Sequence, residues 1–279
     1  MIRRLENLRP GMVAVVGIPF DAYSSFMQGA ALAPAKIRSA WKSGAMNLCA
    51  ECGIDLGTHA NFIDLGDLDI AGETAVIEKI ETTIDDLLGH GVRIISLGGD
   101  HAITYPVFKS HSTRFAGLDI LHLDAHPDLY DSYDDNRYSH ACAFARIMEE
   151  KLAARLVQVG IRAFNPHQRK QAQRFGVEIV DMQNLQKAAA VKWKNPVYLS
   201  IDLDVLDPAF APGVSHYEPG GMSTRQVIEL IQGLPVPIAG ADIVEFNPTR
   251  DYHEVTAMVA VKILKEVAAR MLGLPLERT

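Results

Sequence analysis

Short apolar runs rich in β-branched residues alternate with longer amphipathic stretches along most of the chain. A strand buried on both faces is a continuous apolar run, whereas a surface helix repeats its apolar positions every three to four residues. The alternation predicts an α/β fold with a mostly parallel sheet of roughly eight strands, covered by helices on both faces. The predicted strands are 12–18, 61–66, 93–99, 119–125, 156–161, 177–181, 197–204 and 238–246, and the clearest predicted helices are 73–91, 224–234 and 253–272.

Composition places the chain among ordinary folded proteins. Of its 279 residues, 48% are hydrophobic and 22% are charged, which is typical of a protein with a full-sized core. No linker, repeat or low-complexity tract divides it, so residues 1–279 are interpreted as one domain. The formal net charge of −7 and the lack of a basic run argue against a nucleic-acid or anionic-membrane surface.

The sequence also predicts a cytoplasmic location. No run is long and apolar enough to cross a bilayer, and the short apolar stretch near the start does not have the pattern of a signal peptide. Cys49, Cys52 and Cys142 provide no disulfide framework, which fits a reducing compartment. The lone C-x-x-C pair, Cys49 and Cys52, is weak evidence for a zinc or redox site.

Four polar motifs follow the predicted carboxyl ends of strands, where ligands bind in open parallel sheets. They are LGGDH (97–101), DAHPD (124–128), SIDLDVLDP (200–208) and VEFNP (244–248). Gly98 and Gly99 are expected to let the backbone bend sharply off the strand. Side chains alternate along a strand, so residues two apart in DAHPD and in SIDLD share a face.

The motifs should bring four carboxylates and two imidazoles to one edge of the sheet. Buried carboxylates in contact repel one another unless a cation neutralises them. An oxygen-rich set with one imidazole for each metal and no cysteine favours two Mn²⁺ ions, with Ni²⁺, Co²⁺ or Zn²⁺ as alternatives. Two neighbouring divalent ions can activate water for attack on an electrophile. The predicted ligands are His101, Asp124, His126, Asp128, Asp202 and Asp204.

Each of these motifs alone also fits a structural role. DAHPD could be a turn with a capped helix, and Asp202 or Asp204 could cap the loop that leads to Pro208. Asp100 is interpreted as a support for the backbone or for His101 rather than as a ligand. Three motifs at three predicted strand ends make the metal site the better explanation.

Two further residues would complete a hydrolytic site. His140 lies one short loop after DAHPD, and an imidazole near its ordinary pKa can relay protons at neutral pH. Glu245 ends the last predicted strand, where its carboxylate could bind a planar guanidinium through two parallel hydrogen bonds. The structural alternatives are a surface or helix-capping histidine, and a buried glutamate held by a lysine or arginine.

Taken together, these motifs resemble those of a known family. GGDH, DAHPD, SIDLDVLDPAFAPG and DIVEFNP are similar to motifs of the ureohydrolases, the arginase, agmatinase and formiminoglutamase family, from about residue 17 to residue 271. HLDAHPDLYD, YSHACAFARIMEE and PGVSHYEPGG look most like plant-type arginases, which are nearer to agmatinases than to animal arginases. The resemblance implies a three-layer α/β/α fold, a binuclear manganese centre and a homo-oligomer, either trimer or hexamer.

The resemblance also implies the reaction: hydrolysis of the guanidino group of a small cationic substrate to urea and an amine. It implies roles for the residues as well. His101 and Asp128 would hold one metal, His126 and Asp204 the other, with Asp124 and Asp202 bridging. Glu245 would grip the guanidinium, and His140 would be the proton-shuttling histidine. In the mechanism that we expect, Asp128 or His140 delivers a proton to the leaving amine.

Two positions depart from the family pattern. Agmatinases and animal arginases usually carry Gly-Thr-Gly-Thr-Pro after the aspartate motif, whereas this chain has GVSHYEPGG (213–221). His216 therefore stands where a substrate-facing threonine is common, with Glu218 nearby. Ala141 follows the shuttle histidine, where glycine is common. Neither change touches a metal ligand, so both concern the substrate rather than the reaction.

The loop LYDSYDDNRYSH (129–140) is predicted to meet the substrate's tail. Its acids, Asp131, Asp134 and Asp135, would suit the cationic tail of agmatine. Its other polar residues, Asn136, Arg137 and Ser139, could instead bind the α-carboxylate of L-arginine. Both substrates stay open, and a formiminoglutamase or another guanidino-acid hydrolase is an alternative. A catalytically silent metal-binding relative is a remote alternative, disfavoured because every ligand is present.

Overall fold

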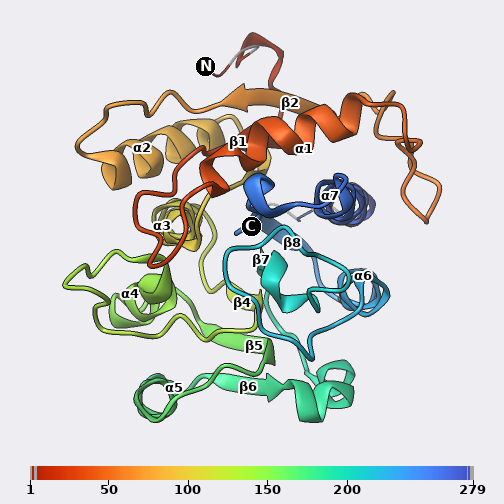
Figure 1. The fold of residues 1–279 in the computed structure, drawn as a ribbon. Helices are drawn as coiled ribbons and strands as arrows, with labels where there is room; N and C mark the ends of the chain where they lie inside the picture. Colours follow the sequence, from red (N-terminus) through yellow and green to blue (C-terminus); the bar gives the residue numbers. More distant parts are fainter. Residues whose placement is uncertain (1, 3–4, 275, 277–279) are drawn as a thin grey trace.

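The computed structural model describes residues 2, 5–274 and 276. They contain one eight-stranded sheet in which all paired strands are parallel (Figure 1). Each predicted strand is present, with ends that agree within two residues. The strands are β1 (Val13–Gly17), β2 (Phe62–Asp67), β3 (Arg93–Leu97), β4 (Asp119–Leu123), β5 (Arg155–Ile161), β6 (Glu178–Asp181), β7 (Val197–Asp202) and β8 (Ile238–Val244).

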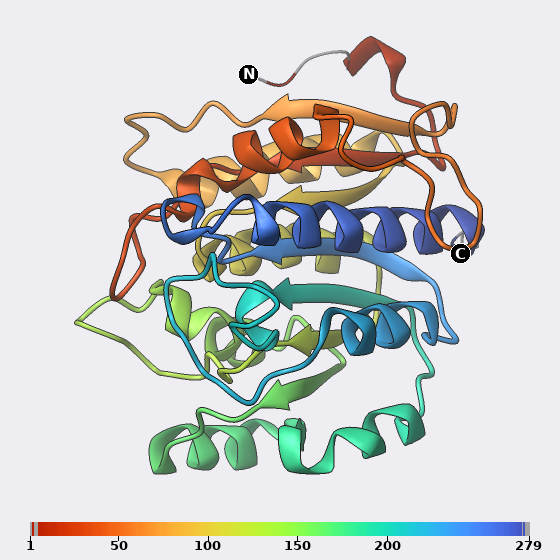
Figure 2. The same ribbon diagram turned by 45° about the vertical axis from the view of Figure 1, so that its right-hand side comes forward.

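Helices cover both faces of the sheet and make a three-layer α/β/α fold, as predicted (Figures 1 and 2). One face carries α2 (Val76–Gly89), α3 (Thr104–Arg114), α4 (Ala143–Glu149) and α5 (Pro166–Phe175). The other carries α1 (Ala33–Lys42), α6 (Thr224–Gln232) and α7 (Val255–Gly273). Short 3₁₀ helices are η1 (Leu5–Asn7), η2 (Ala30–Leu32), η3 (His101–Ile103), η4 (His140–Cys142), η5 (Met182–Ala190), η6 (Leu203–Val205) and η7 (Pro248–Arg250).

Local sequence explains these elements. β3, β4, β7 and β8 are buried along their whole length because helices pack on both sides of them. In α6 the side chains of Ser223 and Gln226 cap each other's backbone N–H groups, which satisfies donors that the first turn leaves unpaired. The same helix buries Val227, Ile228 and Ile231 against the core.

The sheet order places the polar motifs together. The order is β2-β1-β3-β8-β7-β4-β5-β6, so the four strands that end in motifs, β3, β8, β7 and β4, are consecutive neighbours. Their arrows point to the same side in Figure 2, where the long loops gather. Gly99 is required there for close packing, because a Cβ atom on it would lie 1.8 Å from the carbonyl oxygen of Phe20. Its φ is not positive, so crowding rather than a left-handed turn explains the glycine.

Two further predictions concern membrane-spanning helices and the state of the cysteines. No helix among them is both long and apolar enough to span a membrane. All three cysteines are free; Cys49 and Cys52 are exposed, and Cys142 is buried.

Candidate metal centre

The predicted ligands leave the sheet at the ends of three strands. β4 ends at Leu123, and the following turn carries Asp124, His126 and Asp128, the last with a left-handed φ of 50°. β7 ends at Asp202 rather than at residue 204. The Asp202 carboxylate accepts a hydrogen bond from the backbone N–H of Asp204 at 2.7 Å, which turns the chain into η6. The predicted strand therefore stops early, although both carboxylates still reach the site.

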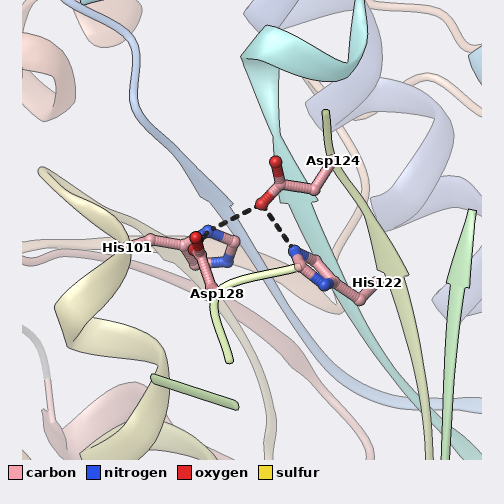
Figure 3. A group of neighbouring side chains, drawn as sticks. All are labelled: His101, His122, Asp124 and Asp128. Atoms are coloured by element: carbon pink, nitrogen blue, oxygen red, sulfur yellow. Dashed lines mark hydrogen bonds and ion pairs between the residues drawn. The ribbon is translucent and has the colours of Figure 1, made fainter. Parts of the chain in front are cut away.

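One group of ligands surrounds the imidazole of His101. Its Nδ1 atom lies 3.0 Å from Asp128 Oδ2, 3.2 Å from Asp124 Oδ2 and 3.3 Å from Asp202 Oδ2. Figure 3 shows His101 and Asp128 facing Asp124 across this small space. Nδ1 is buried and makes no hydrogen bond to the described residues. An orphaned imidazole nitrogen beside three carboxylates is the arrangement that a divalent cation would satisfy.

A second group surrounds His126. Its Nδ1 atom lies 2.9 Å from Asp204 Oδ2 and 3.5 Å from Asp124 Oδ1. Asp124 thus offers one carboxylate oxygen to each group, as a bridging ligand must. The structure brings together all six predicted ligands, and the oxygen-rich donor set with one imidazole in each group fits two divalent ions.

The cluster is electrostatically unfavourable as bare protein. Burial and the nearby carboxylates of Asp204 and Asp124 raise the pKa of Asp202 well above its usual value. Burial and Asp124 likewise raise the pKa of Asp204. Burial also acts to raise the pKa of Asp124, but His122 and the other imidazoles outweigh it and hold that pKa low. Divalent cations would let all of these carboxylates ionise together.

His140 and Glu245 form a buried pair beside the cluster. His140 Nδ1 lies 2.8 Å from Glu245 Oε1, and its Nε2 lies 2.8 Å from the hydroxyl of Ser25. Burial acts to lower the pKa of His140, but the Glu245 carboxylate outweighs it and raises that pKa to about 9. Glu245 is itself in a left-handed conformation, with φ 63°, and its Oε1 also accepts the backbone N–H of His101 at 2.8 Å. The strained backbone fixes this carboxylate beside the cluster of candidate ligands.

Asp100 has the supporting role that the sequence indicated. Its buried carboxylate accepts hydrogen bonds from the backbone N–H groups of Ala102 and Tyr23, at 3.1 and 3.0 Å, and from the hydroxyl of Ser24. Asp100 therefore ties the loop after β1 to the turn that presents His101.

The cluster opens into a cavity of about 440 Å³. Its inner wall contains metal-site residues together with His140, His216 and Glu245. Its outer wall comes largely from the segment after β4, from the connection between β5 and α5, and from the first turn of α5. These outer residues are Tyr130, Tyr133, Ala163, Phe164, Asn165 and Gln168, with Ser25, Ala141 and Glu218 completing the lining.

Asn136 and Ser139 lie outside this lining among the described residues. The Asn136 side chain accepts the backbone N–H of Tyr138 at 2.9 Å, and the Ser139 hydroxyl donates to the carbonyl of Tyr23 at 3.3 Å. Asp131, from the same loop, contacts Gln171 and Arg174 of α5. A substrate-binding role for Asn136 and Ser139 stays a prediction.

The structure also places at the cluster three buried residues to which the sequence motifs assigned no role. His122 lies 2.7 Å from Asp124, and Ser200 lies 2.9 Å from His101 Nε2. Ser200 in turn donates to Asp242, a buried carboxylate in β8. A signal was available for two of them, because His122 and Ser200 stand two residues before a ligand and so share its face of the strand. Asp242 opens the motif DIVEFNP, but it lies within the apolar strand β8 rather than after its end, so its position did not indicate a role at the cluster.

Comparison with known proteins agrees with this geometry. The family model described as Arginase family matches residues 12–269. Arginase 1, mitochondrial, from Arabidopsis thaliana is 43% identical over 96% of this chain and 83% of its own length. An agmatinase from Neisseria gonorrhoeae is 34% identical over 91% of this chain and 85% of its own. The solved arginase from Medicago truncatula superposes with a TM-score of 0.89 at 40% identity, covering 93% of this chain and 87% of that one. The chain belongs to the arginase family.

Proposed function

We propose that the protein hydrolyses the guanidino group of a small cationic substrate, releasing urea and an amine. One observation carries the proposal. Two imidazoles and four carboxylates meet at one end of a cavity, directly beside a carboxylate that is not part of either ligand group, Glu245. The family relationship supports the same reaction class.

We propose two Mn²⁺ ions as the metals, with Ni²⁺, Co²⁺ or Zn²⁺ as alternatives. His101 and Asp128 would hold one ion, His126 and Asp204 the other, and Asp124 and Asp202 would bridge. When bound, such a pair supplies Lewis acidity, which lowers the pKa of water and makes it nucleophilic at neutral pH.

Glu245 would orient the substrate. Its Oε1 accepts hydrogen bonds from His101 and His140, and no hydrogen bond to Oε2 is present among the described residues. Oε2 is therefore available to a guanidinium N–H group in the cavity, with Oε1 beside it for a second contact. The negative charge would hold the guanidinium carbon above the metal ligands, where water attacks it.

His140 would supply the proton for the leaving amine. The neighbouring Glu245 carboxylate raises the pKa of His140 against the effect of burial, which favours the protonated imidazole. The Nε2 atom of His140 lies 2.8 Å from Ser25 Oγ and also accepts the backbone N–H of Ser25 at 3.1 Å, so Nε2 would have to turn away from that N–H to release a proton. His140 and Ser25 both line the cavity, where the leaving amine would take the proton. Cleavage of the carbon–nitrogen bond leaves the amine with that proton and the carbon as urea. Asp128, the alternative donor, lies 3.0 Å from His101 Nδ1 and also lines the cavity.

The substrate's tail would meet the outer wall of the cavity. Gln168 is 4% exposed and lines the cavity. Its side-chain amide makes no hydrogen bond to the described residues. The Tyr130 hydroxyl accepts a hydrogen bond from the Asn165 side chain and donates none to the described residues, so its proton could reach a ligand. His216, 5.4 Å from His140 between ring centroids, would contact the guanidino end.

L-arginine is the first substrate we propose, with ornithine as the amine, because identity is higher to the plant arginases than to the agmatinases. Agmatine, which would give putrescine, is the second. One observation favours it: within the described part of the chain no lysine or arginine lines the cavity, so no cationic side chain awaits an α-carboxylate.

A urea-release screen tests the proposal. The Mn²⁺-loaded protein is assayed with L-arginine, agmatine, guanidinobutyrate and free guanidine, with metal-stripped protein as the control. Metal-dependent urea release from one of the first two supports it. Release from guanidinobutyrate alone would make this a guanidino-acid hydrolase, and two bound metals without urea from any guanidine would indicate a silent relative.

We also propose a homo-oligomer, a trimer or hexamer, and a cytoplasmic location. Light scattering of the purified protein tests the first, and cell fractionation tests the second.

A further inference from the structure

A third buried imidazole, His122, lies at the metal cluster. Its Nε2 is 2.7 Å from Asp124 Oδ2, and the side chain is fully buried. Potential ligand atoms of His101, His122, Asp124 and Asp128 all lie within 4.8 Å of one another, and Figure 3 shows His122 and His101 on either side of the Asp124 carboxylate. By proximity alone, His122 is as suitable for a metal as His101.

The protonation of His122 distinguishes a ligand from a support. An imidazole nitrogen that binds a metal must carry a lone pair, whereas one that supports a carboxylate must carry a hydrogen. Which nitrogen carries the hydrogen is set by the partner of the other one. In this structure that partner is Gln158 of β5, whose Nε2 lies 3.0 Å from His122 Nδ1.

A backbone carbonyl fixes the orientation of the Gln158 amide. The same Nε2 lies 2.6 Å from the carbonyl oxygen of Pro127. The reversed amide would put its oxygen against that carbonyl oxygen, and two acceptors would repel. The NH₂ group therefore faces both neighbours, giving one hydrogen to Pro127 and one to His122 Nδ1. His122 Nδ1 must accept, so in the neutral imidazole the hydrogen is on Nε2, facing Asp124.

We propose that His122 is a positioning residue for the bridging carboxylate rather than a third metal ligand. Its Nε2–H donates to Asp124 Oδ2, while the backbone N–H of His126 donates to Oδ1 at 2.5 Å. Both carboxylate oxygens are thereby fixed, and each keeps a lone pair for a cation. The inference rests on the proposed metal centre and adds a residue pair, His122 and Gln158, that sets its geometry.

The surroundings support this role. The His122 ring stacks on Phe144 of α4, with 3.8 Å between centroids and 25° between planes, which prevents the imidazole from turning away. Gln158 also holds Pro127, the residue between two ligands, against β5. One amide therefore restrains both the bridging carboxylate and the turn that carries His126 and Asp128.

Metal binding by three variants tests the proposal. His122→Phe keeps a ring against Phe144 but loses the donor, His122→Gln keeps a donor N–H but loses the ring, and Gln158→Met removes the amide at similar length. Each is titrated with Mn²⁺, and free ion is followed by electron paramagnetic resonance. Circular dichroism and thermal unfolding confirm that each variant is folded.

We expect His122→Phe to bind two Mn²⁺ at saturation with roughly 10- to 100-fold weaker affinity, the usual effect of losing a group that orients a ligand. His122→Gln should restore most of that affinity, and Gln158→Met should weaken it less than His122→Phe. Loss of one ion at saturation in His122→Phe would make His122 a ligand and overturn the proposal. So would equal weakening in His122→Phe and His122→Gln, or wild-type affinity in His122→Phe. A wild-type protein that binds no pair of ions would instead refute the proposed metal centre.

Discussion

Replacing Glu245 with glutamine should separate substrate binding from folding and metal binding. The two donors that face Oε1, the backbone N–H of His101 and Nδ1–H of His140, both need an acceptor. The amide oxygen of glutamine can serve both, so the internal contacts and the fold should survive. The NH₂ group must then take the place of Oε2 and point into the cavity, where it would face the N–H groups of the guanidinium.

The expected loss of kcat/KM follows from this exchange of an acceptor oxygen for a donor NH₂ group. A hydrogen bond to a charged group contributes about 2–3 kcal/mol, which corresponds to a decrease of about 30- to 150-fold in kcat/KM. Removing the carboxylate should also lower the pKa of His140 below its value of about 9, because burial then acts without the neighbouring negative charge. The variant should therefore lose its protonated imidazole at a lower pH than the wild type.

The assay measures kcat/KM by urea release across pH, on whichever guanidine proves to be the substrate, together with metal content. Glu218→Gln is the matched control, because it removes a negative charge from the cavity wall without touching His140; we expect it to lose less than about tenfold. Near-wild-type kcat/KM in Glu245→Gln with both metals bound would refute the role of Glu245 and, with it, the assigned substrate class.

Three further predictions concern the metals, the proton and acid stability. Asp124→Ala should lose both ions on dialysis, because its two oxygens face the two ligand groups; two retained ions per chain or full activity would contradict a binuclear site. His140→Asn should keep its metals but lower kcat by about 10²-fold, the scale of general acid–base loss, so an unchanged rate across neutral pH would leave His140 a structural residue. Burial lowers the pKa of His111 to about 4, so between pH 6.5 and 4 the unfolded chain binds a proton that the folded protein does not. As the pH falls from 6.5 to 4, the free energy of unfolding should therefore decrease by about 3 kcal/mol more in the wild type than in His111→Gln. Urea denaturation at a series of pH values measures this difference. Parallel plots of unfolding free energy against pH for the two proteins would contradict the prediction.

The sequence predicts the strands and the ligands for a local reason. A strand buried on both faces must be apolar at every position, so β3, β4, β7 and β8 are visible as runs that end where polar residues begin. Because parallel strands end at one edge, Asp124, Asp202 and His101 could be expected to meet before any coordinates were known. Even Asp100 could be assigned, since a carboxylate just before a helical turn tends to cap it.

The roles that depend on a partner across the sheet required the tertiary structure. Nothing near His122 in the sequence shows that Gln158, 36 residues away, gives a hydrogen to its Nδ1, or that Pro127 fixes the orientation of that amide. Those contacts exist because β4 pairs with β5, and strand order is not encoded in any single strand. The outer wall of the cavity depends in the same way on where the start of α5 packs, which brings Gln168 to the cavity lining while Asn136 bonds within its own loop. Hydrophobic periodicity is a local property of the chain, whereas the protonation and orientation of a buried polar group are determined by atoms that only folding brings within hydrogen-bonding distance.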